Sequence, residues 1–104
     1  MAQMAAVAKL TAAEGKGDEL AKVIADLVAA VRDSEPGTLV YAAARDSNES
    51  DVFWFYELYD SAESAAAHSS GSALADAGGR MRGLVAGRPE VHRLAPVAAK
   101  GLPG

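Results

Sequence analysis

The stretch Asp51–His68, DVFWFYELYDSAESAAAH, decides how this chain folds. Its first half is the densest aromatic run in the protein, and a β-branched and aromatic run of this length predicts a strand. Alternate side chains of a strand point to opposite faces, so one face carries Val52, Trp54, Tyr56 and Leu58 and the other carries Phe53, Phe55, Glu57 and Tyr59. Both faces are largely apolar. We therefore expect the protein's own helices to cover one of them and a partner subunit to cover the other.

Two segments before this stretch also predict strands, and a helix is predicted between them. Residues Gln3–Thr11 alternate weakly, which indicates a first strand, and Thr38–Arg45 predicts a second. The polar loop Asp46–Asp51 joins this second strand to the aromatic strand, so the two should form an antiparallel hairpin. The helix begins at Asp18 and ends before Pro36-Gly37, and its apolar stripe is Leu20, Val23, Ile24, Leu27, Val28 and Val31.

A second helical region follows the aromatic strand. Asp60 is placed to cap the start of this helix, with Glu63 three residues later as in a capping box. The alanines after Glu63 favour helix, and Gly71 should end it. We expect two further short helical pieces at Ala73–Ala77 and Arg80–Ala86, separated by two glycines.

Val91–Val97 predicts a last strand, and its Pro96 places it at a sheet edge or a strand end, because proline has no backbone N–H to donate. The resulting order, β-α-β-β-α-β, is that of a ferredoxin-like α+β fold with a four-stranded antiparallel sheet and helices on one face. We expect a single domain over residues 1–104, with its core at about 3–98 and a C-terminal tail at 99–104. The second face of such a sheet is bare in a monomer, which favours a homodimer.

Composition excludes several classes of partner and chemistry. The chain has 104 residues, a formal net charge of −4 and no cysteine, so disulfides, thiolate nucleophiles and Cys-ligated metals are excluded. The acidic balance without a basic stripe argues against nucleic acid as a partner. No run of about 18 apolar residues could span a membrane, and the N-terminus does not resemble a signal peptide, so we expect a cytoplasmic protein.

The order and spacing of five short motifs resemble the antibiotic biosynthesis monooxygenase family. The motifs are Gly17-Asp18-Glu19-Leu20, Glu35-Pro36-Gly37-Thr38, Phe55-Tyr56-Glu57-Leu58-Tyr59, Ala67-His68 and Gly87-Arg88-Pro89-Glu90-Val91. The resemblance implies a dimeric α+β barrel in which two sheets pack face to face and each subunit has a pocket between its sheet and its helices. Some members are cofactor-free monooxygenases that oxidise quinols or polycyclic phenols with molecular oxygen; others resemble isomerases or degrade haem.

The monooxygenase function implied by the resemblance needs a base, hydrogen-bond donors and a dry aromatic pocket. An electron-rich phenol that loses its proton can reduce O2 directly, and histidine is the side chain whose ordinary pKa suits that base. We therefore predict His68, Tyr59 and Trp54 as catalytic residues, with His68 as the base. The predicted substrate-binding residues are Tyr41, Phe55 and Glu57, and Glu57 could also orient His68.

Each of these residues also has a structural interpretation. His68 could tie down its helix, and the aromatic side chains are more often part of a core or an interface than of a substrate platform. Glu57 could belong to a hydrogen-bond network, because a buried carboxylate must be paired. The two tyrosines could be packing residues whose hydroxyl groups reach water.

Neither a metal nor a cofactor is expected. His68 and His92 lie in different elements without the spacing of metal ligands, and the chain has no glycine-rich phosphate loop. Haem-degrading relatives place an asparagine early on the first strand, as the resemblance implies, whereas this chain has Gln3 and Ala5 there. The expected ligands are a small aromatic substrate and O2.

Two other functions stay open. One is a dimer that binds a small ligand without chemistry, in which His68, Tyr59 and Trp54 would face different compartments. The other is an enzyme that isomerises or breaks down a small oxygenated signal molecule, using the same base without oxygen.

Overall fold

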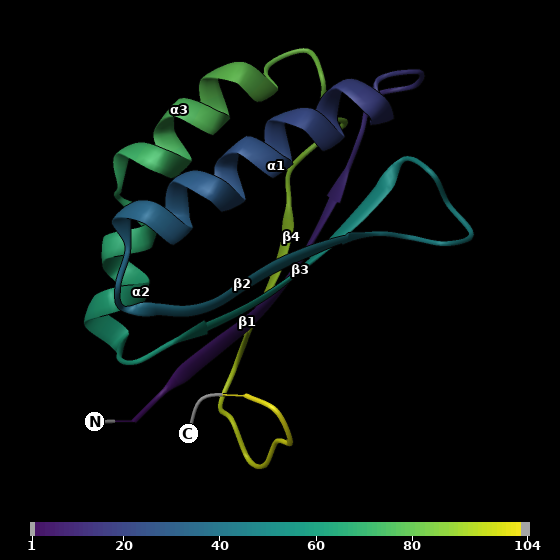
Figure 1. Cartoon of the computed structure of the whole chain (residues 1–104). Helices are drawn as coiled ribbons and strands as arrows, with labels where there is room; N and C mark the ends of the chain where they lie inside the picture. Colours follow the sequence, from purple (N-terminus) through teal and green to yellow (C-terminus); the bar gives the residue numbers. More distant parts are fainter. Residues whose placement is uncertain (1, 103–104) are drawn as a thin grey trace.

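A computed structural model describes residues 2–102 of the chain. Its elements follow in the order β1 (Met4–Thr11), α1 (Gly17–Ser34), β2 (Thr38–Arg45), β3 (Val52–Tyr59), α2 (Ala62–Ser69), α3 (Ser72–Met81) and β4 (Glu90–Leu94). The strands form one antiparallel sheet in the order β2-β3-β1-β4. All three helices of residues 2–102 lie on one side of it (Figure 1). The predicted ferredoxin-like α+β fold is therefore confirmed.

Helix α1 forms where apolar residues recur every three or four positions. Asp18 and Glu19 stand in its first turn, where the positive end of the helix dipole stabilises them. The stripe predicted from the sequence packs against Leu10, Phe53 and Phe55 of the sheet, and these residues form the centre of the core. Its buried members are Leu20, Val23, Ile24, Leu27 and Val31.

The hairpin of β2 and β3 matches the prediction from the aromatic strand. Tyr41 lies opposite Glu57, and Arg45 lies opposite Phe53. The connecting loop is stabilised by the Asp46 carboxylate, whose Oδ1 accepts hydrogen bonds from the backbone N–H groups of residues 48 and 49 at 2.8 and 3.0 Å. An acidic side chain that bonds its own loop in this way is a common means of closing a turn.

The start of α2 differs from the prediction by one residue. Ser61, not Asp60, is the N-cap, and its hydroxyl accepts a hydrogen bond from the backbone N–H of Ser64 at 3.2 Å. Asp60 instead accepts a hydrogen bond from the Ser64 hydroxyl. The serine takes the cap because it is the residue with extended backbone immediately before the helix.

The region after Gly71 corrects a second prediction. One helix, α3, runs through Gly78 and Gly79, which are exposed, because the buried Ala73 and Ala77 hold its other side in the core. The expected helical piece at Arg80–Ala86 ends at Met81, and Val85 instead pairs with Ala12 beyond the end of β1.

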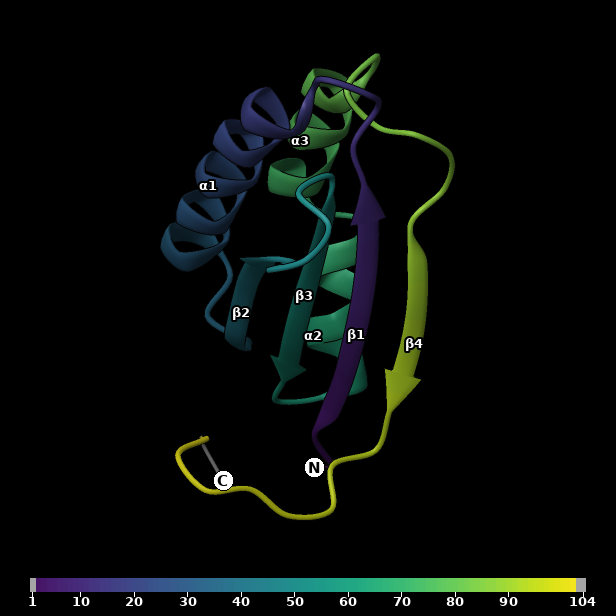
Figure 2. The same ribbon diagram turned by 90° about the vertical axis from the view of Figure 1, so that its right-hand side faces the viewer.

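The last strand is shorter than predicted. β4 ends at Leu94, so Pro96 lies outside it, and β4 is an edge strand as expected. The chain after β4 curls below the sheet on the side away from the helices (Figures 1 and 2). Of the predicted tail at 99–104, residues 103 and 104 lie outside the described residues.

Strand register decides which residues face the helices. In an antiparallel sheet, residues directly opposite each other point to the same side. One row across the sheet is therefore Tyr41, Glu57, Ala6 and Arg93, and the next contains Ala43, Phe55, Ala8 and Val91. These rows face the helices, whereas Trp54 and Leu94 are exposed on the other side, where no described helix lies.

Candidate functional site

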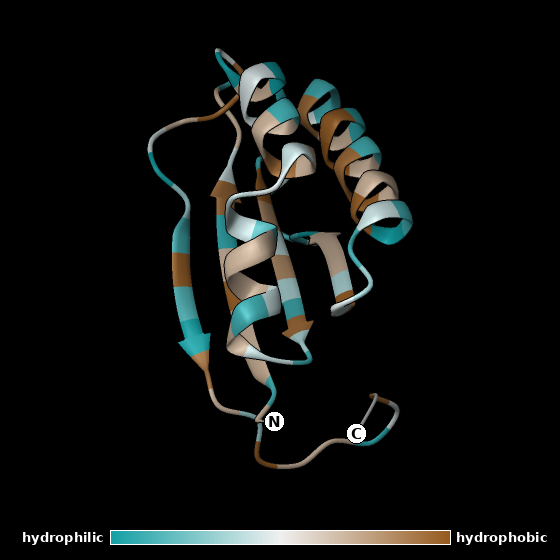
Figure 3. Ribbon diagram, turned by 90° about the vertical axis from the view of Figure 1, so that its left-hand side faces the viewer, coloured by the Kyte–Doolittle hydropathy of each residue, from teal (hydrophilic) through white to brown (hydrophobic). Residues whose placement is uncertain are grey.

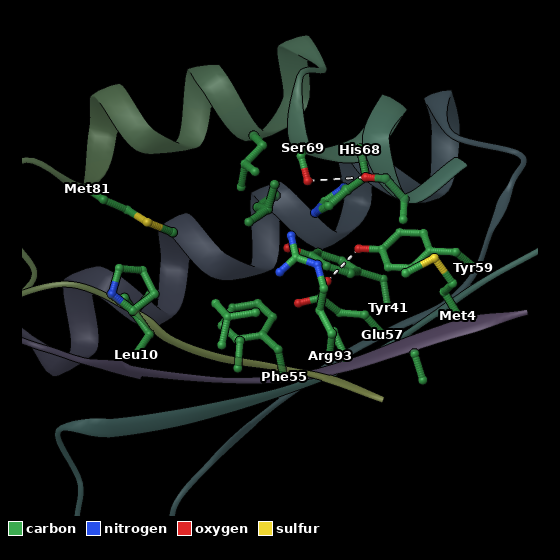
Figure 4. Close-up of a pocket in the computed structure, with 18 residues that line it drawn as sticks. Met4, Leu10, Tyr41, Phe55, Glu57, Tyr59, His68, Ser69, Met81 and Arg93 are labelled. Atoms are coloured by element: carbon green, nitrogen blue, oxygen red, sulfur yellow. Dashed lines mark hydrogen bonds between the residues drawn. The ribbon is translucent and has the colours of Figure 1, made fainter. Parts of the chain in front are cut away.

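A cavity of about 280 Å³ lies between the helix-facing side of the sheet and helices α2 and α3 (Figure 4). It exists because the central strand β1 contributes two alanines, Ala6 and Ala8, where a larger side chain would fill the space. Most of its wall is apolar, with Leu10, Leu27, Phe55, Leu74, Met81 and Val91. Its polar side chains are those of Tyr41, Glu57, Tyr59, His68, Ser69 and Arg93. An apolar cavity with a few polar groups is the usual form of a small-molecule site.

His68 reaches this cavity from the last turn of α2. It is the buried residue of that helix, with 4% of its surface exposed, and Figure 3 shows weakly hydrophobic and hydrophilic bands along the helix. Its imidazole ring packs against the rings of Tyr41 and Tyr59, at centroid distances of 4.8 and 5.6 Å. The ring edge points into the cavity (Figure 4).

Glu35 orients His68. The Nδ1 atom of His68 lies 2.8 Å from Oε1 of Glu35, which also accepts a hydrogen bond from the Thr38 hydroxyl at 3.0 Å. An ionised carboxylate can only accept, so Nδ1 carries a proton, and in the neutral imidazole Nε2 is then the nitrogen with a free lone pair. No hydrogen bond to Nε2 is recorded, and no fully buried side-chain nitrogen or oxygen of the described residues lacks a partner. The Nε2 atom is therefore open to a ligand.

Glu35 also connects the cavity to a second, more polar cleft. This cleft is lined by Glu35, Thr38, Ser64 and Ser72, and His68 contributes to its wall as well as to that of the apolar cavity. The pair of His68 and Glu35 thus lies between the apolar cavity and this more polar cleft. The side chain of Glu35 is 14% exposed, so the carboxylate keeps contact with the polar side.

The two tyrosines act as donors at the polar end of the cavity. The Tyr59 hydroxyl donates a hydrogen bond to Oε1 of Glu57 at 2.5 Å. Burial, followed by this hydrogen bond and the charge of Glu57, raises the pKa of Tyr59 far above its ordinary value. Burial, followed by the charges of Glu57 and Glu35, likewise raises the pKa of Tyr41. Both phenols therefore stay protonated near neutral pH. The single proton of Tyr59 is donated to Glu57, so Tyr41 is the phenol that can donate to a ligand oxygen.

Five of the six predicted site residues line this cavity together: Tyr41, Phe55, Glu57, Tyr59 and His68. They converge because alternate residues of β3 point to the helices and α2 folds back over the end of that strand. Glu57 does not orient His68 as the sequence suggested, since it bonds Tyr59 instead.

Trp54 is the residue that the structure does not bring to the cavity. It stands on the open side of the sheet, where its Nε1 donates to Oδ2 of Asp46 at 2.9 Å and the Lys9 ammonium lies 5.6 Å from its ring centroid. The alternation of β3 explains this, because Trp54 lies between two residues that face the helices. Its predicted catalytic role does not fit this position. His92 also lies on the open side, 3.2 Å from Glu90.

Sequence reasoning missed two residues of the cavity region, Glu35 and Arg93. Glu35 is the C-cap of α1, where the negative end of the helix dipole disfavours a carboxylate, and that misfit could have indicated a second role. Arg93 and Val91 are two residues apart on β4, so the period of two in a strand would have placed both on one face. Among residues 2–102, no group of three or more His, Asp or Glu side chains could hold a metal ion.

The fold and this site define a class: small ferredoxin-like α+β proteins with a ligand cavity between sheet and helices. Residues 4–79 match the family model described as antibiotic biosynthesis monooxygenase. The chain belongs to that family, which supports a monooxygenase-type or small-molecule-binding role. No helix in the described part of the chain is both long and apolar enough to cross a membrane.

Solved structures of similar proteins agree with this assignment. A candidate antibiotic biosynthesis monooxygenase from Caulobacter crescentus is 34% identical, with a TM-score of 0.87 over 93% of this chain and 92% of that one. A second, from Chloroflexus aurantiacus, is 31% identical, with a TM-score of 0.81 over 97% and 99%. A Pseudomonas aeruginosa protein is similar in fold, at 22% identity and a TM-score of 0.85 over 94% and 97%. No curated protein matches the chain.

Proposed function

We propose that this protein is a cofactor-independent monooxygenase that oxidises a quinol or a polycyclic phenol with molecular oxygen. The observation that carries the proposal is the state of His68. Its Nδ1 is held by Glu35, its Nε2 is open to a mostly apolar cavity, and protonated tyrosine hydroxyls stand beside it. That arrangement suits removal of a phenolic proton inside a dry chamber.

Each group then has a chemical task. Nε2 of His68 takes the proton of the substrate hydroxyl, and the electron-rich anion that results reduces O2. The hydroxyl of Tyr41 stabilises the oxyanion, and the apolar wall excludes water that would compete for it. The reduced oxygen bonds to a ring carbon as a peroxide, and its outer oxygen takes the proton held by His68. Cleavage of the O–O bond with loss of the hydrogen on that carbon leaves a carbonyl group and releases water. Loss of two hydrogens from the substrate and gain of one oxygen atom balance the uptake of one O2 and the release of one water.

Oxygen uptake with a panel of hydroquinones tests this function. Replacement His68→Ala should slow the reaction about 10²- to 10⁴-fold, the usual contribution of a general base. His92→Ala is the matched loss of an imidazole, because His92 lies on the open side of the sheet and away from the cavity. Its mass in solution is compared with that of the wild type, because the dimer proposed below uses the same side. Equal rates for the wild type and His68→Ala would remove His68 from the mechanism. Spontaneous quinol oxidation is subtracted with a protein-free blank.

The same residues could serve an isomerase or a lyase of a small oxygenated signal molecule. The observation that favours this alternative is the pairing of an open base, His68, with protonated phenols at the same end of the cavity, since such a pair can move a proton without oxygen. Turnover of a substrate under anaerobic conditions would support it over the oxygenase. Ligand binding without turnover in either atmosphere would favour a binding protein.

We further propose that the protein works as a homodimer formed through the open side of the sheet. The row Tyr56, Val7 and His92 crosses the middle of that side, and Trp54 and Leu94 are exposed near it. A second copy of the chain can cover this face with the same face of its own sheet, as in a two-fold symmetric dimer. Sedimentation equilibrium at micromolar concentration should give the dimer mass, and Val7→Glu should shift it to the monomer mass. A monomer mass for the wild type would contradict the proposal.

A further inference from the structure

Arg93 is the one lysine or arginine that lines the cavity among the described residues. It projects from the edge strand β4, next to Val91, and Figure 4 shows its side chain rising into the space between sheet and helices. The mechanism described above does not use it. Arg93 is an exposed residue, so its positive charge stands where the mostly apolar cavity meets solvent.

The guanidinium group of Arg93 has no protein partner in the described part of the chain. Two other arginines have one: Arg45 pairs with Asp18 at 2.9 Å and Arg80 pairs with Asp26 at 2.8 Å. The exposed Arg82 and Arg88 have none among the described residues, but neither lines the cavity. No ion pair or hydrogen bond of the Arg93 side chain is recorded in residues 2–102. Its donors are therefore available to a ligand.

Glu57 is the acidic side chain closest to Arg93 in the sheet, yet the two do not pair. They share a row with Ala6 between them, which separates their strands by about 10 Å. Oε1 of Glu57 already accepts a hydrogen bond from the Tyr59 hydroxyl. The carboxylate on β3 repels an anion and the guanidinium on β4 attracts one, so the row carries a charge gradient across the floor of the cavity.

We propose that the ligand of this cavity is a small hydroxyaromatic acid whose carboxylate binds Arg93 while its hydroxyl lies at His68. The proposal rests on the proposed function in that it uses the same cavity and the same base. Guanidinium binds carboxylate through two parallel N–H···O bonds, and the apolar wall accommodates the ring. The cavity is near the lower limit of usual ligand sites, which are about 300 Å³ or more, so a ligand of one or two rings fits best.

A pair of matched ligands tests this substrate class without any turnover. 1-Hydroxy-2-naphthoate and 1-naphthol share the ring and the hydroxyl and differ in the carboxylate. Isothermal titration calorimetry on the wild type should show about tenfold tighter binding of the acid, since a partly exposed charge pair contributes modestly. The preference should shrink as salt rises from 50 mM to 500 mM, because exposed charges are screened.

Variants assign the preference to one side chain. Arg93→Gln should bring the two affinities within about twofold of each other and leave 1-naphthol binding unchanged, whereas Arg93→Lys should keep part of the preference. Arg82→Gln is the control, because it removes the same charge from an exposed residue outside the cavity. A fold defect in a variant would weaken the binding of both ligands and leave the ratio of their affinities unchanged. Loss of the Arg93 contact would weaken the binding of the acid alone and change that ratio.

Three outcomes would overturn the inference: equal binding of both ligands by the wild type, no binding of either at millimolar concentration, or an unchanged ratio in Arg93→Gln. The outcome is distinct from that of the proposed function, which is read by oxygen uptake with 1,4-dihydroxynaphthalene and its 2-carboxylate. Selective binding of the acid without oxygen uptake would leave the Arg93 site in place and remove the oxygenase. Oxygen uptake without any preference for the acid would support the oxygenase and remove the Arg93 site.

Discussion

The two sides of the same sheet differ in what covers them, and the difference shows what makes a site. On the helix side, β3 presents Phe53 to a closed core and presents Phe55 and Glu57 to a cavity. On the other side, it presents Trp54, whose neighbours are the charged Lys9 and Asp46. Both sides are aromatic, so ring content alone does not identify a binding site. The helices decide it, because they bring His68 and Glu35 to one side only.

The two sides also bury their residues by different means. Phe53 is enclosed by α1 and by its own strand neighbours. Leu58, on the open side, is only 1% exposed although no described helix lies there (Figure 1). Helices packed against the sheet therefore account for burial on the helix side, but they do not account for the burial of Leu58.

The largest effect on this comparison should come from truncating one ring on each side. Phe53→Ala should reduce the free energy of unfolding by about 3–5 kcal/mol, because it leaves a cavity in the core. Trp54→Ala should cost only about 1 kcal/mol, since this residue is 37% exposed. Urea denaturation at low protein concentration measures both. Similar losses for the two variants would mean that the open side is as well packed as the core.

The next effect concerns the pair of His68 and Glu35. Glu35→Gln keeps an oxygen that can accept from Nδ1 but removes the charge, and it should slow any reaction that depends on His68 about 10- to 100-fold. Nitrogen NMR of the imidazole should show Nδ1 protonated in the wild type near neutral pH. A protonated Nε2 in the neutral ring would contradict the assigned orientation of the pair. Asp33→Asn, an exposed change beside the end of α1, serves as the control.

A smaller effect should appear at alkaline pH. The folded protein holds the protons of Tyr41 and Tyr59 above the pH at which an unfolded tyrosine loses its own, because their pKa values are raised from 10.0. The folded state then binds more protons than the unfolded state, so stability falls as pH rises above 10 and does not change below it from this cause. Tyr41→Phe should lose less stability than the wild type between pH 9 and pH 11.5. Urea midpoints across that range measure it, and parallel curves for the two proteins would refute it.

The smallest effect is confined to the open side. The indole N–H of Trp54 is the main cause that lowers the pKa of the Asp46 carboxyl, followed by the backbone N–H groups of residues 48 and 49. Trp54→Phe removes only the first of these donors, so the pKa of Asp46 should rise part of the way to its ordinary value. NMR titration of the carboxyl carbon measures the change. An unchanged titration would mean that the indole does not hold Asp46 in solution.

Most of the fold could be predicted from periodicity. The stripe of α1 and the alternation of β3 are strong patterns, and both elements lie within a residue or two of their predicted bounds. The prediction was wrong around Gly78 and Gly79, because local helix propensity there is overridden by the burial of Ala73 and Ala77. Such an override depends on what α3 packs against, which sequence spacing does not contain.

The candidate site could be predicted in part. His68, Tyr59 and Glu57 were found because their residue types suit acid–base chemistry and two of them share a strand face. Trp54 was predicted as a catalytic residue because of its residue type, although the alternation along β3 put it on the other face. Glu35 was named only as part of a motif, because no local rule joins a residue at the end of α1 to a histidine 33 positions later.

The sequence by itself determined which residues become strands and helices and which side chains share a face, because those properties repeat over a few neighbouring residues. Only the tertiary structure decided which face became a cavity, which carboxylate holds His68 and which positive charge enters the apolar space. These depend on contacts between elements far apart in the chain, and their physical cause is the packing of α2 and α3 over two small alanines of β1.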